Sequence, residues 1–261
     1  MSIADKTIVL TRTLSQSASI TDALMAAGAR VVSFPTIELL PPPDSSIVRR
    51  AIADITRFDW IVFTSANAVS CFFDYLRQYG NCQNSIVQQK TAVVGPATAQ
   101  ALVQHGVSPD LIADSYQAEG IIAAFQQLRD QQQQKRGSRI LIPRALEARE
   151  LLPKELTQMG FDVTVAPVYQ SAMPCLAADA FVQLDGADGI AFTAPSTARN
   201  FATLLQEAGM DVLCYLNTRK VFSIGSITTE ELKDLGVSQT QLVQATQATT
   251  ESLVEAITAA F

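Results

Sequence analysis

The sequence is poor in the side chains that most often carry metal or nucleophilic chemistry. It has one histidine, His105, which directly precedes Gly106 at a predicted helix end, and this position favours a capping or surface role over catalysis. A single histidine excludes multi-histidine metal sites, and we exclude histidine-dependent triads as well. The cysteines lie far apart without the spacing of metal ligands, so we expect no metal and four reduced thiols: Cys71, Cys82, Cys175 and Cys214.

Phosphate-binding and export signals are absent too. The chain contains no Gly-x-Gly-x-x-Gly, no Gly-x-x-x-x-Gly-Lys-Ser/Thr and no Gly-x-Ser-x-Gly segment, so no cofactor is predicted and serine hydrolysis lacks support. The net charge of −6 argues against a nucleic-acid partner. No apolar run approaches the length of a membrane span, and the N-terminus lacks the apolar region of a signal peptide. We therefore expect a cytoplasmic protein with no membrane partner.

What the chain does contain is an internal duplication at an offset of about 130 residues. Two copies of this length indicate a duplicated lobe rather than a repeat array, and two related lobes predict a cleft between them. With 48% hydrophobic and 17% charged residues, both lobes can have a core. The clearest matching pairs are Lys6–Arg12 with Ser138–Arg144, Met25–Val31 with Thr157–Val163, Ile61–Ser65 with Ile190–Ala194, and Val93–Thr98 with Ser223–Thr228.

Short apolar runs alternate with amphipathic segments along both copies. The first copy opens with a strand at 7–10, a helix that ends at Gly28 and a second strand at 31–34, which is a βαβ unit. Near-continuous apolar strands are typical of parallel sheets that are covered on both faces. The sequence therefore predicts an α/β fold made of two similar doubly wound parallel-sheet lobes.

Four strand-to-helix turns carry small and hydroxyl residues at matched positions of the two copies. Such turns leave helix N-terminal N–H groups free for carboxylate or phosphate, and ligands of open parallel sheets bind at the carboxyl ends of the strands. The alternative is ordinary helix capping, but four matched turns favour an anion-binding site. The turns are Phe63–Asn67, Val94–Thr98, Phe192–Ser196 and Ile224–Thr228.

Outside these turns, two arginines, a tyrosine and a group of charged residues are candidates for a role in the site. Arg12 and Arg144 end equivalent strands, and each is interpreted either as a bidentate carboxylate ligand or as a solvated surface arginine. Tyr169 breaks the internal symmetry, because the first copy has Ile37 there; packing in a linker is the alternative to function. The charged residues Glu147, Arg149 and Glu150 favour a helix face near its start.

Taken together in their order and spacing, five short segments resemble uroporphyrinogen-III synthase, and the resemblance covers essentially the whole chain. It implies a cofactor-free lyase of tetrapyrrole biosynthesis that cyclises hydroxymethylbilane, a chain with eight carboxylates, while inverting the terminal pyrrole. It also implies transient hand-over of this substrate from the preceding enzyme of the pathway. The segments are Phe63–Ser65, Val94–Ala99, Val168–Gln170, Phe192–Ser196 and Ile224–Ser226.

The resemblance further implies a lobe of residues 1–36 plus 171–261, a lobe of residues 37–170, and a two-stranded linker near 36–40 and 169–172. It makes Tyr169 the leading candidate for a proton donor or hydrogen-bond partner, supported by Thr98 and Thr228. The residues expected to bind substrate carboxylates, with Arg12 and Arg144, are Thr64, Ser65, Asn67, Gly95, Thr193, Ser196, Gly225 and Ser226.

Two other classes of protein remain possible at this point. A non-catalytic two-lobed binding protein for an anionic metabolite would share the duplication, but most such proteins are exported and no signal segment is found. A scaffolding protein would leave the four matched turns unexplained. We expect a monomer, because no zipper pattern or exposed apolar edge is evident.

Overall fold

The computed structural model describes residues 3–80, 88–113, 117–131 and 137–261. Its backbone divides into two compact units, Met1–Glu38 with Ala172–Phe261 (unit 1) and Leu39–Ser171 (unit 2). Cys82 and most of the glutamine-rich loop between the two copies lie outside the described residues.

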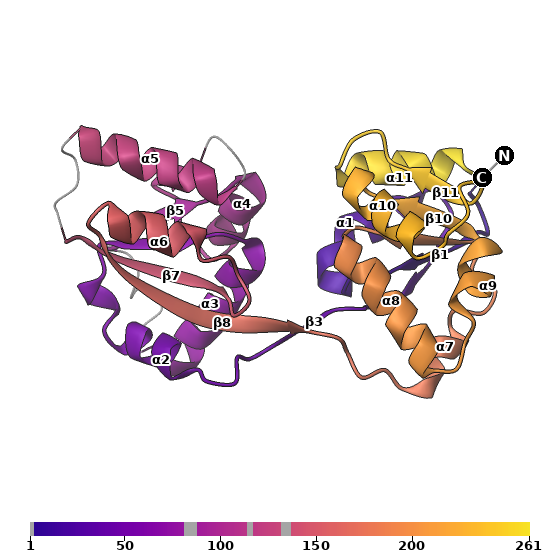
Figure 1. Ribbon diagram of the computed structural model, residues 1–261, viewed down its shortest axis with the longest axis horizontal. Helices are drawn as coiled ribbons and strands as arrows, with labels where there is room; N and C mark the ends of the chain where they lie inside the picture. The colour runs from indigo at the N-terminus through magenta and orange to yellow at the C-terminus, as the bar shows by residue number, and fades with distance from the viewer. Residues whose placement is uncertain (1–2, 81–87, 114–116, 132–136) are drawn as a thin grey trace. The chain divides into compact units, whose positions relative to one another are not determined.

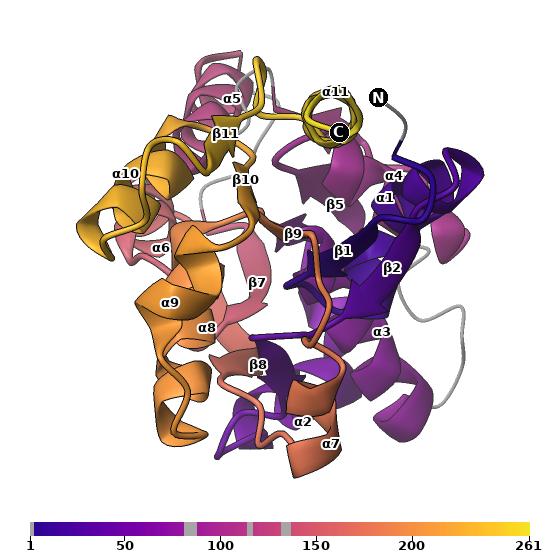
Figure 2. The same ribbon diagram turned by 90° about the vertical axis from the view of Figure 1, so that its right-hand side faces the viewer.

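Unit 1 is a five-stranded parallel sheet covered on both faces. The strands lie in the order β11-β10-β9-β1-β2. Figure 2 shows α1 and α11 on one side of this sheet and α8, α9 and α10 on the other, in agreement with its two hydrophobic clusters. The elements are β1 Thr7–Leu10, α1 Leu14–Ala26, β2 Arg30–Ser33, α7 Ala178–Val182, β9 Gly189–Phe192, α8 Pro195–Glu207, α9 Val212–Asn217, β10 Lys220–Ser223, α10 Ser226–Asp234, β11 Leu242–Gln244 and α11 Thr250–Ala259.

Unit 2 contains the second sheet, in the order β3-β8-β7-β4-β5-β6. Helices α5 and α6 cover one face, and α2, α3 and α4 cover the other (Figure 1). The elements are β3 Glu38–Leu40, α2 Ser46–Ala53, a 3-10 turn at Ile55–Arg57, β4 Trp60–Phe63, α3 Ala66–Tyr79, β5 Lys90–Val93, α4 Pro96–Gln104, β6 Leu111–Ile112, α5 Ala118–Asp130, β7 Arg139–Ala145, α6 Leu151–Gln158 and β8 Asp162–Ala172.

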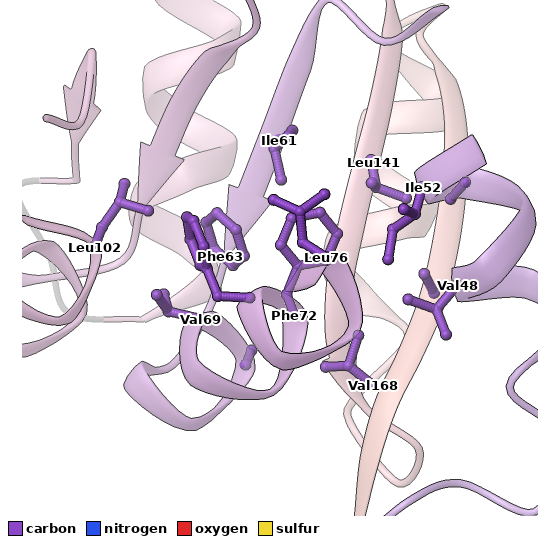
Figure 3. Packing of buried hydrophobic residues seen from close by; sticks show 14 of the residues in the cluster. Val48, Ile52, Ile61, Phe63, Val69, Phe72, Leu76, Leu102, Leu141 and Val168 are labelled. Carbon is purple, nitrogen blue, oxygen red and sulfur yellow. The ribbon is translucent and has the colours of Figure 1, made fainter. Parts of the chain in front are cut away.

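The alternation of side chains along β4 explains why both faces need helices. Ile61 and Phe63 pack with Phe72 and Leu76 of α3 in one cluster (Figure 3), while Trp60 and Val62 pack in the cluster on the other face. All four strand residues are buried. A strand that is apolar on both sides is stable only between two layers, so the predicted α/β fold with parallel sheets is confirmed.

Apart from β3, which has no counterpart in unit 1, the two sheets have the same strand order when the duplication is taken into account. Strands β7 and β8 repeat β1 and β2, whereas β4, β5 and β6 repeat β9, β10 and β11. The order β8-β7-β4-β5-β6 of unit 2 is thus equivalent to β2-β1-β9-β10-β11 of unit 1. Each sheet combines the opening βαβ of one copy with the later strands of the other, and the strand order reverses between β1 and β9 and between β7 and β4.

A repeated aspartate joins these central strand pairs at their amino ends. Asp188, directly before β9, accepts hydrogen bonds from Thr7 N and Lys6 Nζ, both at 2.9 Å. Asp59 holds the equivalent place before β4 and accepts from Arg139 N at 2.8 Å. Burial raises the pKa of Asp188, but the bonds from Thr7 and Lys6 outweigh burial, so the pKa lies below its ordinary value.

We expect Asp188→Asn to destabilise unit 1 by about 1 kcal/mol at neutral pH, since the half-exposed ion pair is screened by solvent. A depressed carboxyl pKa stabilises the fold above the unfolded-state pKa, and this stability is lost as pH falls below about 4. The measurement is urea unfolding at pH 7 and at pH 3. The difference between wild type and variant should shrink at pH 3; an equal difference at both pH values would contradict the linkage.

Candidate functional site

Each of the four predicted turns begins a helix at the carboxyl edge of its sheet. The N-cap residues are Ser65 for α3, Gly95 for α4, Ala194 for α8 and Gly225 for α10. Pro96 and Pro195 occupy the first helical turn, where a missing N–H leaves no bond unmade.

Capping accounts for one turn and leaves three open. Ser65 Oγ accepts from Ala68 N at 3.1 Å, which is the ordinary capping role. In the described part of the chain, Gly95, Ala194 and Gly225 make no side-chain bond to the helices that they begin. Thr197 N of α8 donates to Ala194 O at 3.1 Å. The other first amides of α4, α8 and α10 remain without a side-chain cap and can receive an anion.

In unit 1, Arg12 and Thr193 lie where the strand order reverses. Both follow the paired residues Leu10 and Ala191 of β1 and β9 by two positions. Arg12 is half-buried, burial lowers the pKa of its guanidinium, and none of the described ion pairs involves it. Thr193 Oγ1 is buried and has no hydrogen-bond partner among the described residues. A half-buried cation and an unpartnered hydroxyl that follow paired strand ends are groups suited to a carboxylate.

Around these two groups, a network of hydrogen bonds holds the loop. Thr11 Oγ1 donates to Ala191 O at 2.8 Å, and Thr36 N donates to Thr11 O at 3.1 Å. Asn200 of α8 donates to Thr36 O at 2.8 Å. The network fixes the backbone at Thr11, directly before Arg12.

In unit 2, the equivalent edge contains a pocket of about 390 Å³. Thr64 and Arg144 both line it, together with Val94 and the first residues of α5, Gln117 and Ala118. Arg144 is buried, donates to Arg149 O at 2.8 Å and forms an ion pair with Glu150. The prediction that Glu147, Arg149 and Glu150 form a helix face is wrong: α6 begins at Leu151, and all three lie in the turn before it, because β7 pairs with β8 as far as Ala145.

Tyr169 lies in β8 of unit 2 and meets the first predicted turn. Its hydroxyl is 3.4 Å from Ser65 Oγ, and the residue is 8% exposed. A bulge between Arg144 and Ala145 shifts the register, so that Tyr169 lies opposite Ala145. Val168 and Tyr169 are consecutive, yet both pack in the same hydrophobic cluster, which the normal alternation of a strand forbids. The bulge thus turns the tyrosine toward Ser65.

The other predicted residues divide between the two units. Thr98 is buried in α4, and Thr228 is buried in α10. Next to Thr228, Thr229 Oγ1 bonds Ser223 Oγ at 2.6 Å and Gln244 Oε1 at 2.7 Å. No sequence pattern predicts this network, because it joins α10 to β10 and β11. In unit 2 the first turn also holds the half-buried Asn67 and the second the buried Gly95; in unit 1 the turns hold the half-buried Ser196 and Gly225 and the exposed Ser226.

Metal ligands and activated nucleophiles do not gather in the described residues. No group of three or more His, Cys, Asp or Glu side chains there could hold a metal ion. Burial, with Asp74 nearby, raises the pKa of the Cys71 thiol to about 11, so this thiol is protonated at neutral pH. His105 caps α4 as predicted and stacks on Phe73 with ring centroids 4.2 Å apart. No helix in the described ranges is both long and apolar enough to cross a membrane.

Comparison with known proteins places the chain in a family. Residues 18–255 match the family model described as uroporphyrinogen-III synthase HemD. The uroporphyrinogen-III synthase of Synechococcus elongatus is 35% identical over 235 residues, which are 87% of this chain and 86% of that protein. The crystal structure of uroporphyrinogen-III synthetase from Helicobacter pylori 26695 has the same fold, with a TM-score of 0.61 at 20% identity, covering 96% of this chain and 97% of that one. The chain belongs to the uroporphyrinogen-III synthase family.

Proposed function

We propose that the chain cyclises hydroxymethylbilane to uroporphyrinogen III, with loss of water and inversion of the terminal pyrrole ring. The family match over residues 18–255 carries this proposal. The alternative of a non-catalytic binding protein for an anionic metabolite gains no support from any relative. The carboxyl-edge groups of both sheets agree in chemistry with a substrate that bears eight carboxylates.

Binding in this proposal is carried by cations, hydroxyls and helix amides rather than by a cofactor. Arg12 and Thr193 in unit 1, and Arg144 and Thr64 in unit 2, each bind a substrate carboxylate. The uncapped amides at Gly95, Ala194 and Gly225 bind others. The remaining predicted binding residues, Ser65, Asn67, Ser196 and Ser226, line the same turns.

Catalysis is then mainly positioning. Ring closure without inversion needs no enzyme in this proposal, so the protein must hold the folded chain with the substituted carbon of the last ring against the carbon that loses its hydroxyl. Tyr169 assists departure of that hydroxyl as proton donor or hydrogen-bond partner. Thr98 and Thr228 are buried in the helices that follow the second pair of turns, and they support those turns.

We expect Tyr169→Phe to lower kcat about tenfold, as removal of one hydrogen bond to a developing charge should, while the fold persists. The variant keeps the ring in its cluster and removes only the hydroxyl, and Ser65 retains its cap to Ala68. Turnover of hydroxymethylbilane and thermal unfolding are measured together. Tyr79→Phe, at an exposed tyrosine of α3, is the matched control and should keep wild-type turnover. Full activity in a folded Tyr169→Phe protein would remove this residue from the catalytic set.

One assay tests the function itself. The protein is incubated with freshly generated hydroxymethylbilane, the products are oxidised, and the porphyrin isomers are separated. We expect the type III isomer with native protein and the type I isomer with heat-denatured protein. Type I alone in both samples would refute the enzymatic proposal. The cytoplasmic location, the monomeric state and the hand-over from a preceding enzyme stay predictions.

A further inference from the structure

The pocket of unit 2 lies where the second copy has a turn in place of the first turn of the equivalent helix. In the first copy α1 begins at Leu14, close behind Arg12, whereas α6 begins only at Leu151, well beyond Arg144. The two segments have equal length, because Gly28 and Gly160 end the helices at equivalent places. Residues 146–150 therefore form a turn where the first copy has helix, and Glu150 stands where the first copy has Ala18.

The buried guanidinium of Arg144 needs an anion to compensate its charge. The residue is 5% exposed, and its Nε is buried with no hydrogen-bond partner among the described residues. A buried guanidinium that loses its anion is strongly disfavoured, since neither water nor another group replaces the lost interaction. In this structure the anion is the carboxylate of Glu150.

The two partners of this ion pair differ sharply in their surroundings. The side chain of Arg144 is 6% exposed, but that of Glu150 is 76% exposed. The Glu150 carboxylate is therefore readily solvated once it leaves, whereas Arg144 stays buried and needs another anion in its place. A second carboxylate that entered the pocket would restore the same charge pair, so the exchange leaves no buried charge uncompensated.

The rest of the pocket favours such an exchange at Arg144. Its wall includes Thr64, Gln117, which is the N-cap residue of α5, and Ala118, the first residue of that helix. The other cation, Arg149, is exposed and lies 3.9 Å from Glu119 of α5. Glu147 also lines the pocket and adds a negative charge. A ligand carboxylate would be repelled by both acids, so it binds more easily once Glu150 has left Arg144.

We propose that Glu150 is an internal substitute for a substrate carboxylate, which holds the Arg144 guanidinium in the empty enzyme and must be displaced when substrate binds. The identity of that carboxylate rests on the proposed function, but the exchange at Arg144 does not. Glu150 thus competes with every anion for this pocket and raises the concentration of carboxylate needed to fill it. Among the described residues of unit 1, no carboxylate pairs with Arg12, so no such competitor is found there.

Titration of the protein with propionate tests the exchange without any turnover. The probe signal is the Nε–H correlation of Arg144 in ¹H–¹⁵N NMR spectra, assigned by its loss in Arg144→Lys. We expect Glu150→Gln to lower the apparent Kd of propionate at this signal about threefold to tenfold, the range of a partly exposed ion pair. Glu147→Gln makes the same charge change in the same pocket without freeing Arg144, and its Kd should stay within about twofold of wild type.

Failure of the exchange at Arg144 can be distinguished from failure of the proposed function. A Kd for Glu150→Gln that equals or exceeds that of wild type overturns the proposal and makes Glu150 a support for Arg144. Equal tightening in Glu147→Gln and Glu150→Gln also overturns it, because the effect would then be general electrostatics. With substrate, the proposal predicts a lower KM for Glu150→Gln. Should the wild type yield only the type I isomer, the proposed function fails, and the propionate titration still decides the exchange.

Discussion

Replacing Phe201 by alanine should lower the stability of unit 1 by about 3 to 5 kcal/mol, the usual cost of emptying a buried phenylalanine site. Phe201 of α8 is fully buried, and its ring meets Phe34 at 5.3 Å and Phe192 at 5.4 Å between centroids. These contacts join the helix to the end of β9 and to the residue after β2. The cavity would lie inside the cluster that holds α8 on its sheet, where neighbouring rings cannot collapse far.

The single tryptophan allows the unfolding of unit 2 to be followed separately. Trp60 is buried in unit 2, so its fluorescence reports that unit alone, whereas far-UV circular dichroism reports both. In urea, Phe201→Ala should shift part of the dichroism transition to lower concentration and leave the fluorescence midpoint in place. Phe72→Ala, in the core of unit 2, is the matched control and should shift the fluorescence. A common shift of both signals in Phe201→Ala would mean that the units unfold together.

The largest effect on activity is expected from Arg12→Met, which should lower kcat/KM about 30-fold, equivalent to about 2 kcal/mol for a charge-assisted bidentate contact. Methionine keeps the length and apolar stem of the side chain and removes the charge. Arg12 has no ion-pair partner among the described residues, so its loss leaves no carboxylate unpaired and the fold should persist.

Arg30→Met provides the control for Arg12→Met. Arg30 is exposed at the start of β2, at the amino edge of the same sheet, where parallel sheets do not bind ligands. Steady-state kinetics with hydroxymethylbilane should show the loss at position 12 alone. Similar losses in both variants would indicate long-range attraction between protein and substrate rather than a contact at Arg12.

Much of the fold can be predicted from the sequence because the central strands are short, continuous apolar runs. The run Trp60–Phe63 is apolar at every position, and only a two-sided parallel sheet accommodates it. The four turns are predictable for a similar reason, since small residues and Pro96 or Pro195 directly follow such runs. What these patterns cannot supply is the extent of pairing. Strand β8 runs to Ala172 beside β3, and no local signal in Asp162–Ala172 marks where it ends.

The candidate site was less predictable, because its decisive features depend on pairing between distant segments. The bulge at Val168 turns Tyr169 toward Ser65, and it arises from the register of β7 on β8. Glu150 looks like an ordinary first-turn acid of a helix, and only the late start of α6 reveals it as the partner of Arg144. Aligning the two copies, in which Ala18 of the first corresponds to Glu150 of the second, is the sequence signal that could have singled it out.

The staggered use of the duplication has a consequence for synthesis of the chain. Unit 2 is one uninterrupted stretch, so all of its strand pairings can form while the ribosome is still translating the C-terminal third. Unit 1 is different, because Ile8 must wait for Gly189 before β1 gains its central neighbour. The two sheets are therefore completed at different times during translation. For most of that time the N-terminal βαβ lacks β9, and the edge of β1 stays unpaired.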